Sequence, residues 1–177
     1  MKRKNIKEEI RRFFYICPTS RLRVRQIERE LKLPLPSVIR YCKELETEGI
    51  IKKERISNIY LYSADRISKA YLFEKRFFNI RLLFESGLID YLIKEYSNPT
   101  IILFGSYSKG EDIEKSDIDL YIETPKKHDF NLQRFEKILN RKIQIFNYKN
   151  INDILNPHLS NNIVNGITLN GFLEVFK

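Results

Sequence analysis

Apolar residues in the first part of the chain recur every three or four positions in three segments. The segments run from Ile6 to Cys17, from Val24 to Leu31 and from Val38 to Leu45. This spacing predicts three amphipathic helices. Two short segments rich in β-branched and aromatic residues follow within 50–62, on either side of a Ser-Asn pair, and they predict a β-hairpin. Residues 1–64 are therefore expected to form one small domain of three helices and a hairpin.

A longer helix is predicted over residues 65–86, as a linker to the rest of the chain. It has two apolar stripes at helical spacing, one with Ala70, Phe73, Phe77, Ile80 and Phe84, the other with Ile67, Tyr71, Phe78 and Leu82. A helix that is apolar on two faces must be covered on two sides. Two arrangements satisfy this requirement: a homodimer through residues 66–84, or a core helix buried within a single chain.

The second half of the chain contains two short motifs that predict a metal and phosphate site. An apolar strand, Thr100 to Phe104, ends in Gly105-Ser106, a tight turn whose backbone N–H groups can hold an anion. Further along, Asp117 and Asp119 alternate with apolar residues, so their carboxylates share one face of a strand. Two carboxylates on one face repel each other unless a hard cation such as Mg²⁺ bridges them.

Together the two motifs resemble the minimal nucleotidyltransferase family of the polymerase-beta-like superfamily. Its pattern is Gly-Ser, a few residues, Gly, then Ser-Asp-x-Asp-Leu, which residues 105–120 match. The resemblance implies that Gly105 and Ser106 bind the β- and γ-phosphates of ATP or another nucleoside triphosphate. It implies that Asp117 and Asp119 are catalytic and hold the accompanying Mg²⁺ or Mn²⁺. Residues 87–177 are then expected to form an α/β domain, a mixed sheet flanked by helices.

The chain departs from this family at the third carboxylate. A helix is predicted from Phe130 to Leu139, and the strand after it carries Gln144 where the family has an acid. A neutral amide does not supply the charge that holds the ion beside the attacking hydroxyl. We therefore expect nucleotide binding with weak or absent transfer. Glu123 lies on the same strand face as the aspartates, but we expect it to be a solvated strand end. The Asn-rich segment 147–162 is expected to be a loop.

Positive charge is concentrated in the first part of the chain. Residues 1–65 contain 16 basic and 9 acidic residues, whereas residues 66–177 contain 16 and 14. The helix and hairpin pattern resembles the winged helix-turn-helix domain of bacterial and archaeal regulators, which implies binding of double-stranded DNA. A basic arm at residues 2–4 would assist. The implied DNA-binding residues lie on the third helix (Ser37, Arg40, Lys43) and on the wing (Lys52, Lys53, Arg55).

The sequence thus predicts an α/β two-domain protein, an N-terminal winged helix-turn-helix joined to a nucleotidyltransferase fold. The main functional expectation is a DNA-binding, transcriptional-regulator-like protein whose second domain binds Mg²⁺ and a nucleoside triphosphate. One alternative is an active nucleotidyltransferase that modifies a protein or nucleic-acid hydroxyl. Another is an antitoxin-like partner of a small helical toxin. No apolar stretch approaches membrane-spanning length, so we expect a cytoplasmic protein without a membrane partner.

Overall fold

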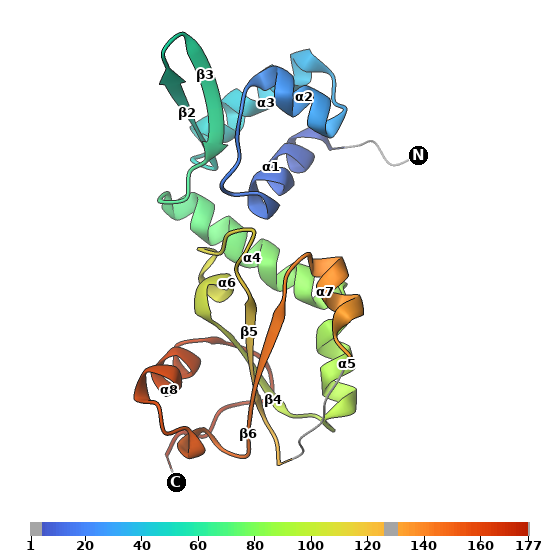
Figure 1. Ribbon diagram of the computed structural model, residues 1–177, viewed down its shortest axis with the longest axis vertical. Helices are drawn as coiled ribbons and strands as arrows, with labels where there is room; N and C mark the ends of the chain where they lie inside the picture. The colour runs from blue at the N-terminus through green and yellow to red at the C-terminus, as the bar shows by residue number, and fades with distance from the viewer. Residues whose placement is uncertain (1–4, 126–130, 177) are drawn as a thin grey trace. The chain divides into compact units, whose positions relative to one another are not determined.

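The computed structural model describes residues 5–125 and 131–176, shown in Figure 1. The chain divides into two compact units, Met1–Lys75 and Arg76–Lys177. The basic arm predicted at residues 2–4 and the predicted helix start at Phe130 lie outside the described residues.

The first unit consists of three helices and a small antiparallel sheet. Its elements are α1 (Ile6–Ile16), β1 (Arg21–Leu22), α2 (Val24–Leu31), α3 (Leu35–Thr47), β2 (Ile51–Ile56) and β3 (Ile59–Ala64). The sheet has the order β1-β3-β2, so the predicted hairpin is present and β1 adds a short third strand. The apolar positions that define the helical spacing form the core, since Ile10, Phe14, Ile27, Val38 and Leu45 are fully buried.

Helix α4 (Lys69–Glu85) begins in the first unit and ends in the second. In one of its two apolar stripes Tyr71 and Phe78 are buried, although Ile67 is 87% exposed. The Tyr71 hydroxyl donates a hydrogen bond to the Phe14 carbonyl at 3.1 Å. The aromatic residues of the other stripe are exposed, Phe73 by 61%, Phe77 by 56% and Phe84 by 44%, whereas Ile80 packs against the core of the second unit. The helix is therefore not the fully buried core helix considered above, and the homodimer stays a prediction.

The second unit is a mixed four-stranded sheet with the strand order β6-β5-β4-β7. Strands β5 and β6 are parallel, whereas β4 is antiparallel to both β5 and β7. Its strands are β4 (Thr100–Phe104), β5 (Ile118–Glu123), β6 (Ile143–Tyr148) and β7 (Ile167–Asn170). Its further helices are α5 (Leu88–Glu95), α6 (Gly105–Lys109), α7 (Gln133–Leu139), the 3₁₀ turn η1 (Ile151–Asp153) and α8 (Pro157–Val164).

Two apolar clusters cover the two faces of this sheet. On one face, the end of α4 together with α5 and α7 packs against Leu103, Ile118 and Leu120. On the other face, η1 and α8 pack against Phe104 and Tyr121. Figure 1 shows α8 on one side of the strands and α5 and α7 on the other. Side chains that alternate along β5 therefore enter two separate cores, as the strand pattern predicts.

The segment 147–162 is not simply a loop, contrary to our expectation. It holds the end of β6, then η1 and most of α8. Asn150 and Asn156 are the N-cap residues of these two helical segments, and the Asn156 side chain accepts from the His158 N–H at 2.9 Å. Asparagine is favoured at such positions, so the Asn-rich composition reflects helix starts. No helix in the described part of the chain is long and apolar enough to cross a membrane.

The homodimer prediction is tested by removing aromatic surface from α4. The double substitution Phe73→Ser/Phe77→Ser should raise the dimer dissociation constant at least about tenfold, because aromatic residues contribute disproportionately to interfaces. Sedimentation velocity over a concentration series measures this change. Ile138→Ser, on the exposed face of α7, is the matched control and should have no effect. A wild-type protein that sediments as a monomer at every concentration would contradict the homodimer.

Candidate functional site

The turn between β4 and α6 brings the two sequence motifs into contact. Gly105 has a φ of +72°, a backbone conformation that residues other than glycine rarely adopt. A Cβ atom at Gly105 would also overlap the Asp119 carboxylate. The position therefore requires glycine for two reasons, its backbone angle and the close approach of Asp119. Gly105 and Asp119 are adjacent because β4 and β5 are antiparallel and Phe104 pairs with Asp119.

Hydrogen bonds within the turn that begins at Gly105, the predicted phosphate-binding turn, stabilise its backbone. The buried Ser108 hydroxyl donates to the Gly105 carbonyl at 2.8 Å, and the Glu111 N–H donates to the Ser106 carbonyl at 3.0 Å. Ser106 itself is half-buried at the first turn of α6. The turn is thus rigid where a triphosphate would approach, which lowers the entropy lost on binding.

The two aspartates differ in their environments. Asp117 is exposed and comes just before β5, whereas Asp119 is half-buried within the strand. Partial burial raises the pKa of Asp119, and the negative charge of Asp117 raises it further. Both effects disfavour the ionised pair, and a bound cation would relieve both. The donor chemistry fits Mg²⁺, which takes one or two carboxylates and completes its coordination with water and phosphate oxygens.

Within residues 5–125 and 131–176 there is no group of three or more His, Cys, Asp or Glu side chains that could hold a metal by themselves. A cation at Asp117 and Asp119 would therefore depend on phosphate oxygens from the nucleotide. The strand register places Gln144 beside Asp119, since these residues pair in the parallel ladder of β5 and β6. Gln144 is exposed and lies at the position that we compared with the third carboxylate of the family.

Glu123 is not a simple solvated strand end. Its carboxylate accepts a hydrogen bond from the Tyr121 hydroxyl at 2.7 Å and another from the Ile151 N–H at 3.1 Å. These bonds tie the end of β5 to the start of η1. The expectation of a solvated strand end is therefore wrong, because η1 folds back onto the strand and takes up the carboxylate.

A buried polar network supports the loop before β5, and the sequence analysis did not identify it. Asn79 donates to the Tyr107 carbonyl at 2.9 Å and to Asp112 Oδ1 at 2.8 Å. Arg141 lies 3.6 Å from Asp112 Oδ2, and both side chains are almost fully buried. The network joins α4, α6, the loop and the start of β6. One signal was available: Asn79 is a polar residue within an apolar helical stretch.

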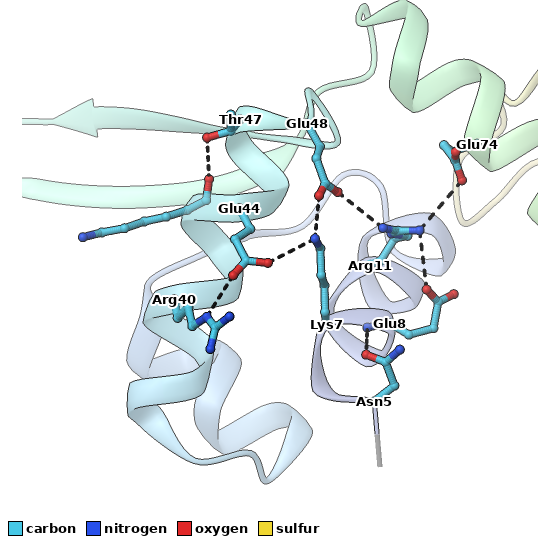
Figure 2. Close-up of polar contacts among 10 residues, drawn as sticks. Asn5, Lys7, Glu8, Arg11, Arg40, Glu44, Thr47, Glu48 and Glu74 are labelled. Carbon is cyan, nitrogen blue, oxygen red and sulfur yellow. Dashed lines mark hydrogen bonds and ion pairs between the residues drawn. The ribbon is translucent and has the colours of Figure 1, made fainter. Parts of the chain in front are cut away.

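The predicted DNA-binding residues lie on α3 and β2 of the first unit. Figure 2 shows that Arg40 forms an ion pair with Glu44, with 2.9 Å between Nε and Oε1. Glu44 also accepts from Lys7 at 3.1 Å, and hydrogen bonds from Lys7 and Arg40 lower the pKa of Glu44. On the wing, Lys52 pairs with Glu54 at 2.6 Å.

The four other predicted DNA-binding residues are less constrained by carboxylates. Lys53 lies 4.2 Å from the centre of the Tyr60 ring, and Arg55 donates to the Ser57 carbonyl at 3.1 Å. Ser37 is half-buried and Lys43 is exposed on α3. Part of the positive charge expected to meet DNA is therefore neutralised within the unit.

The raised pKa of Asp119 predicts how folding stability depends on pH when divalent metal is removed. A carboxyl group whose folded pKa lies above its unfolded value destabilises the fold at higher pH, and the penalty vanishes as pH falls to the unfolded pKa, about 4. Asp119→Asn should therefore raise the melting temperature at pH 7 in EDTA, and the gain should disappear near pH 4. Thermal denaturation at several pH values measures this. An equal gain at every pH would show that charge is not the cause.

Comparisons with known proteins agree with the nucleotidyltransferase fold of the second unit. A family model described as nucleotidyltransferase domain matches residues 86–169. A putative protein adenylyltransferase from Methanocaldococcus jannaschii is 34% identical over 76 residues, which are 39% of this chain and 73% of that protein. No solved structure matches the chain. Since the matched residues 86–169 contain the glycine-serine turn, both aspartates and the sheet that positions them, the chain belongs to the nucleotidyltransferase family.

Proposed function

We propose that this protein transfers a nucleoside monophosphate from a Mg²⁺- or Mn²⁺-bound nucleoside triphosphate to a hydroxyl group of a protein. The proposal rests mainly on the contact between the Gly105 turn and the Asp119 carboxylate. This contact brings the proposed phosphate-binding motif and the proposed metal-binding motif together in one site. The Methanocaldococcus relative is named as a putative protein adenylyltransferase, which favours ATP as the nucleotide and a protein as the acceptor. These findings favour transfer over the nucleotide-binding regulator that the sequence suggested.

The residues have separate roles in the proposed reaction. Gly105 and Ser106 hold the β- and γ-phosphates, and Asp117 and Asp119 hold the cation. When bound, the cation neutralises the charge that develops on the phosphate oxygens. The acceptor oxygen forms a bond to the α-phosphorus, the bond to pyrophosphate breaks, and the hydroxyl proton is released to water. Gln144 adds no charge at this site, so we propose slow transfer compared with an enzyme that has a third carboxylate.

A transfer assay tests the proposal with ATP labelled at the α-phosphate, and with Mg²⁺ or Mn²⁺. Acceptors are the protein itself and the product of the neighbouring gene, which also tests the antitoxin alternative. Asp119→Asn should lower labelling by about 100-fold or more, because one charged group at the transfer site is lost. Gln144→Asp should raise labelling, and Gln144→Ala should leave it unchanged.

Two outcomes would contradict the transfer proposal or part of it. Labelling that is equal in the wild-type protein and Asp119→Asn would mean that the aspartates do not act in transfer. A large loss of labelling in Gln144→Ala would mean that the amide itself contributes, contrary to the role given to it here. Calorimetry of ATP binding with and without Mg²⁺ separates loss of nucleotide binding from loss of chemistry.

Binding of double-stranded DNA by residues 1–64 is a second candidate function, and one observation favours it. A groove of about 570 Å³ lies between the start of α2 and the β2–β3 turn, and Arg23, Arg25 and Arg29 line it together with Tyr60. None of these arginines takes part in an ion pair that joins described residues. Uncompensated arginines beside an exposed aromatic ring suit a phosphate backbone. The resemblance to winged helix-turn-helix domains points the same way.

DNA binding by this groove predicts which substitutions matter. Arg25→Glu/Arg29→Glu should weaken binding of a labelled duplex to the full chain by at least about tenfold and should reduce the salt dependence, because phosphate contacts are lost. Fluorescence anisotropy at several salt concentrations measures both. Arg66→Glu, an exposed arginine outside the groove, is the control. A duplex that binds equally well to the double variant and the control would exclude the groove.

A further inference from the structure

A second pocket, of about 510 Å³, opens beside Asp117 in the nucleotidyltransferase unit. Its walls come from residues 114–117, from one face of α7 and from the turn at residues 140–142. Every residue that lines it is polar or charged, and Asp117 is one of them. The pocket therefore borders the predicted metal site at Asp117, whereas Asp119 and the Gly105 turn do not line it. It was not identified from the sequence.

The strand order indicates which part of the reaction the pocket serves. Strand β5, which carries Asp119, lies between β4 and β6. The phosphate turn follows β4, whereas the pocket lies toward β6, where the Ile118 N–H donates to the Lys142 carbonyl at 2.8 Å. In phosphoryl transfer the attacking and leaving oxygens are roughly in line on opposite sides of the phosphorus. With pyrophosphate on the β4 side, an acceptor hydroxyl in line with it would approach from the β6 side of β5, and the pocket borders that side at Asp117.

The lining of the pocket does not suit a nucleobase. Base recognition in proteins uses aromatic or apolar surface for stacking, together with a few polar groups. This pocket has no aromatic or apolar lining residue. It suits an extended peptide chain, which can pack on the aliphatic parts of these lining side chains and form hydrogen bonds with their polar ends.

The charges of the pocket define the kind of polypeptide. Two of its four basic residues already have carboxylate partners: Arg141 with the buried Asp112 at 3.6 Å and Lys142 with Glu136 at 3.4 Å. Glu136 also accepts from the Ile143 N–H at 3.1 Å. The other two, Lys115 and Lys137, are exposed, and no ion pair between described residues involves them. They are available to attract carboxylates of a ligand.

We infer that this pocket binds the acceptor polypeptide next to its hydroxyl residue, and that Lys115 and Lys137 select acceptors with acidic residues beside that hydroxyl. The inference rests on the proposed transfer to a protein hydroxyl. It adds a specificity-determining pair of lysines on the α7 side of the site, separate from Gly105, Ser106 and the two aspartates that hold the nucleotide and the cation.

The inference is tested by peptide binding, which does not require catalysis. The probes are two fluorescent peptides of equal length, each with a central tyrosine, flanked by glutamates in one and by lysines in the other. Anisotropy with the full chain should show tighter binding of the acidic peptide. The charge reversal Lys115→Glu/Lys137→Glu should weaken that binding at least about tenfold and should reverse the preference between the peptides.

A matched control separates the pocket from the overall charge of the protein. Lys69→Glu/Lys94→Glu makes the same change in net charge at two exposed lysines outside the pocket, and should leave the preference for the acidic peptide unchanged. Wild-type protein that binds both peptides equally, or control and pocket variants that lose binding equally, would overturn the inference. So would an equal loss of Mg²⁺-ATP affinity in the pocket variant, since the lysines would then serve the nucleotide.

The transfer assay with the same peptides distinguishes the two proposals. With Mg²⁺-ATP, the pocket variant should raise KM for the acidic peptide at least about tenfold and leave kcat nearly unchanged, as expected when only binding of the acceptor is lost. If the wild-type protein prefers the acidic peptide in binding but modifies no peptide or protein, the proposed function fails and the pocket assignment stands. If it modifies both peptides with the same KM, the pocket assignment fails and the proposed function stands.

Discussion

The antiparallel pairing of β4 with β5 is the constraint on which the nucleotidyltransferase site depends. Pairing of Phe104 with Asp119 brings the turn after one strand against a carboxylate on the other. The contact is so close that only glycine fits at position 105. It places a negative charge in a half-buried position beside a second aspartate, an arrangement that costs folding free energy. The apolar clusters on both faces of the sheet hold this arrangement in place.

Buried polar contacts also stabilise this part of the nucleotidyltransferase unit. Asp112 is almost fully buried. It accepts a hydrogen bond from Asn79 and forms an ion pair with Arg141. A buried carboxylate without such partners would be strongly destabilising, so these three residues form a unit in which loss of one member affects the others. Because Arg141 also lines the pocket beside Asp117, the same network supports both the loop before β5 and a wall of the proposed acceptor site.

Local patterns in the sequence were enough to predict the helices of the first unit and the strands that precede Gly105 and carry Asp119. These features depend on spacing within a few residues, whereas the place of Gln144 beside Asp119 was expected from the family resemblance. The network of Asn79, Asp112 and Arg141 was not predictable, because its members are far apart in the chain. The neutralisation of Arg40 by Glu44 was overlooked although the two are one helical turn apart. The pocket beside Asp117 requires three segments to be placed together.

The order of strands along the chain has a consequence for the way the protein is synthesised. Strand β4 pairs with two strands. The first, β5, follows it closely in the chain, whereas the second, β7, lies near the end of the unit, where Thr168 pairs with Ile102. During translation, the edge formed by Ile101, Ile102 and Leu103 therefore stays unpaired until almost the whole unit has left the ribosome. An apolar strand with an open edge is a template for aggregation. A nascent chain stalled before β7 would thus be a target for chaperones, even though β5, which carries Asp119, is already complete.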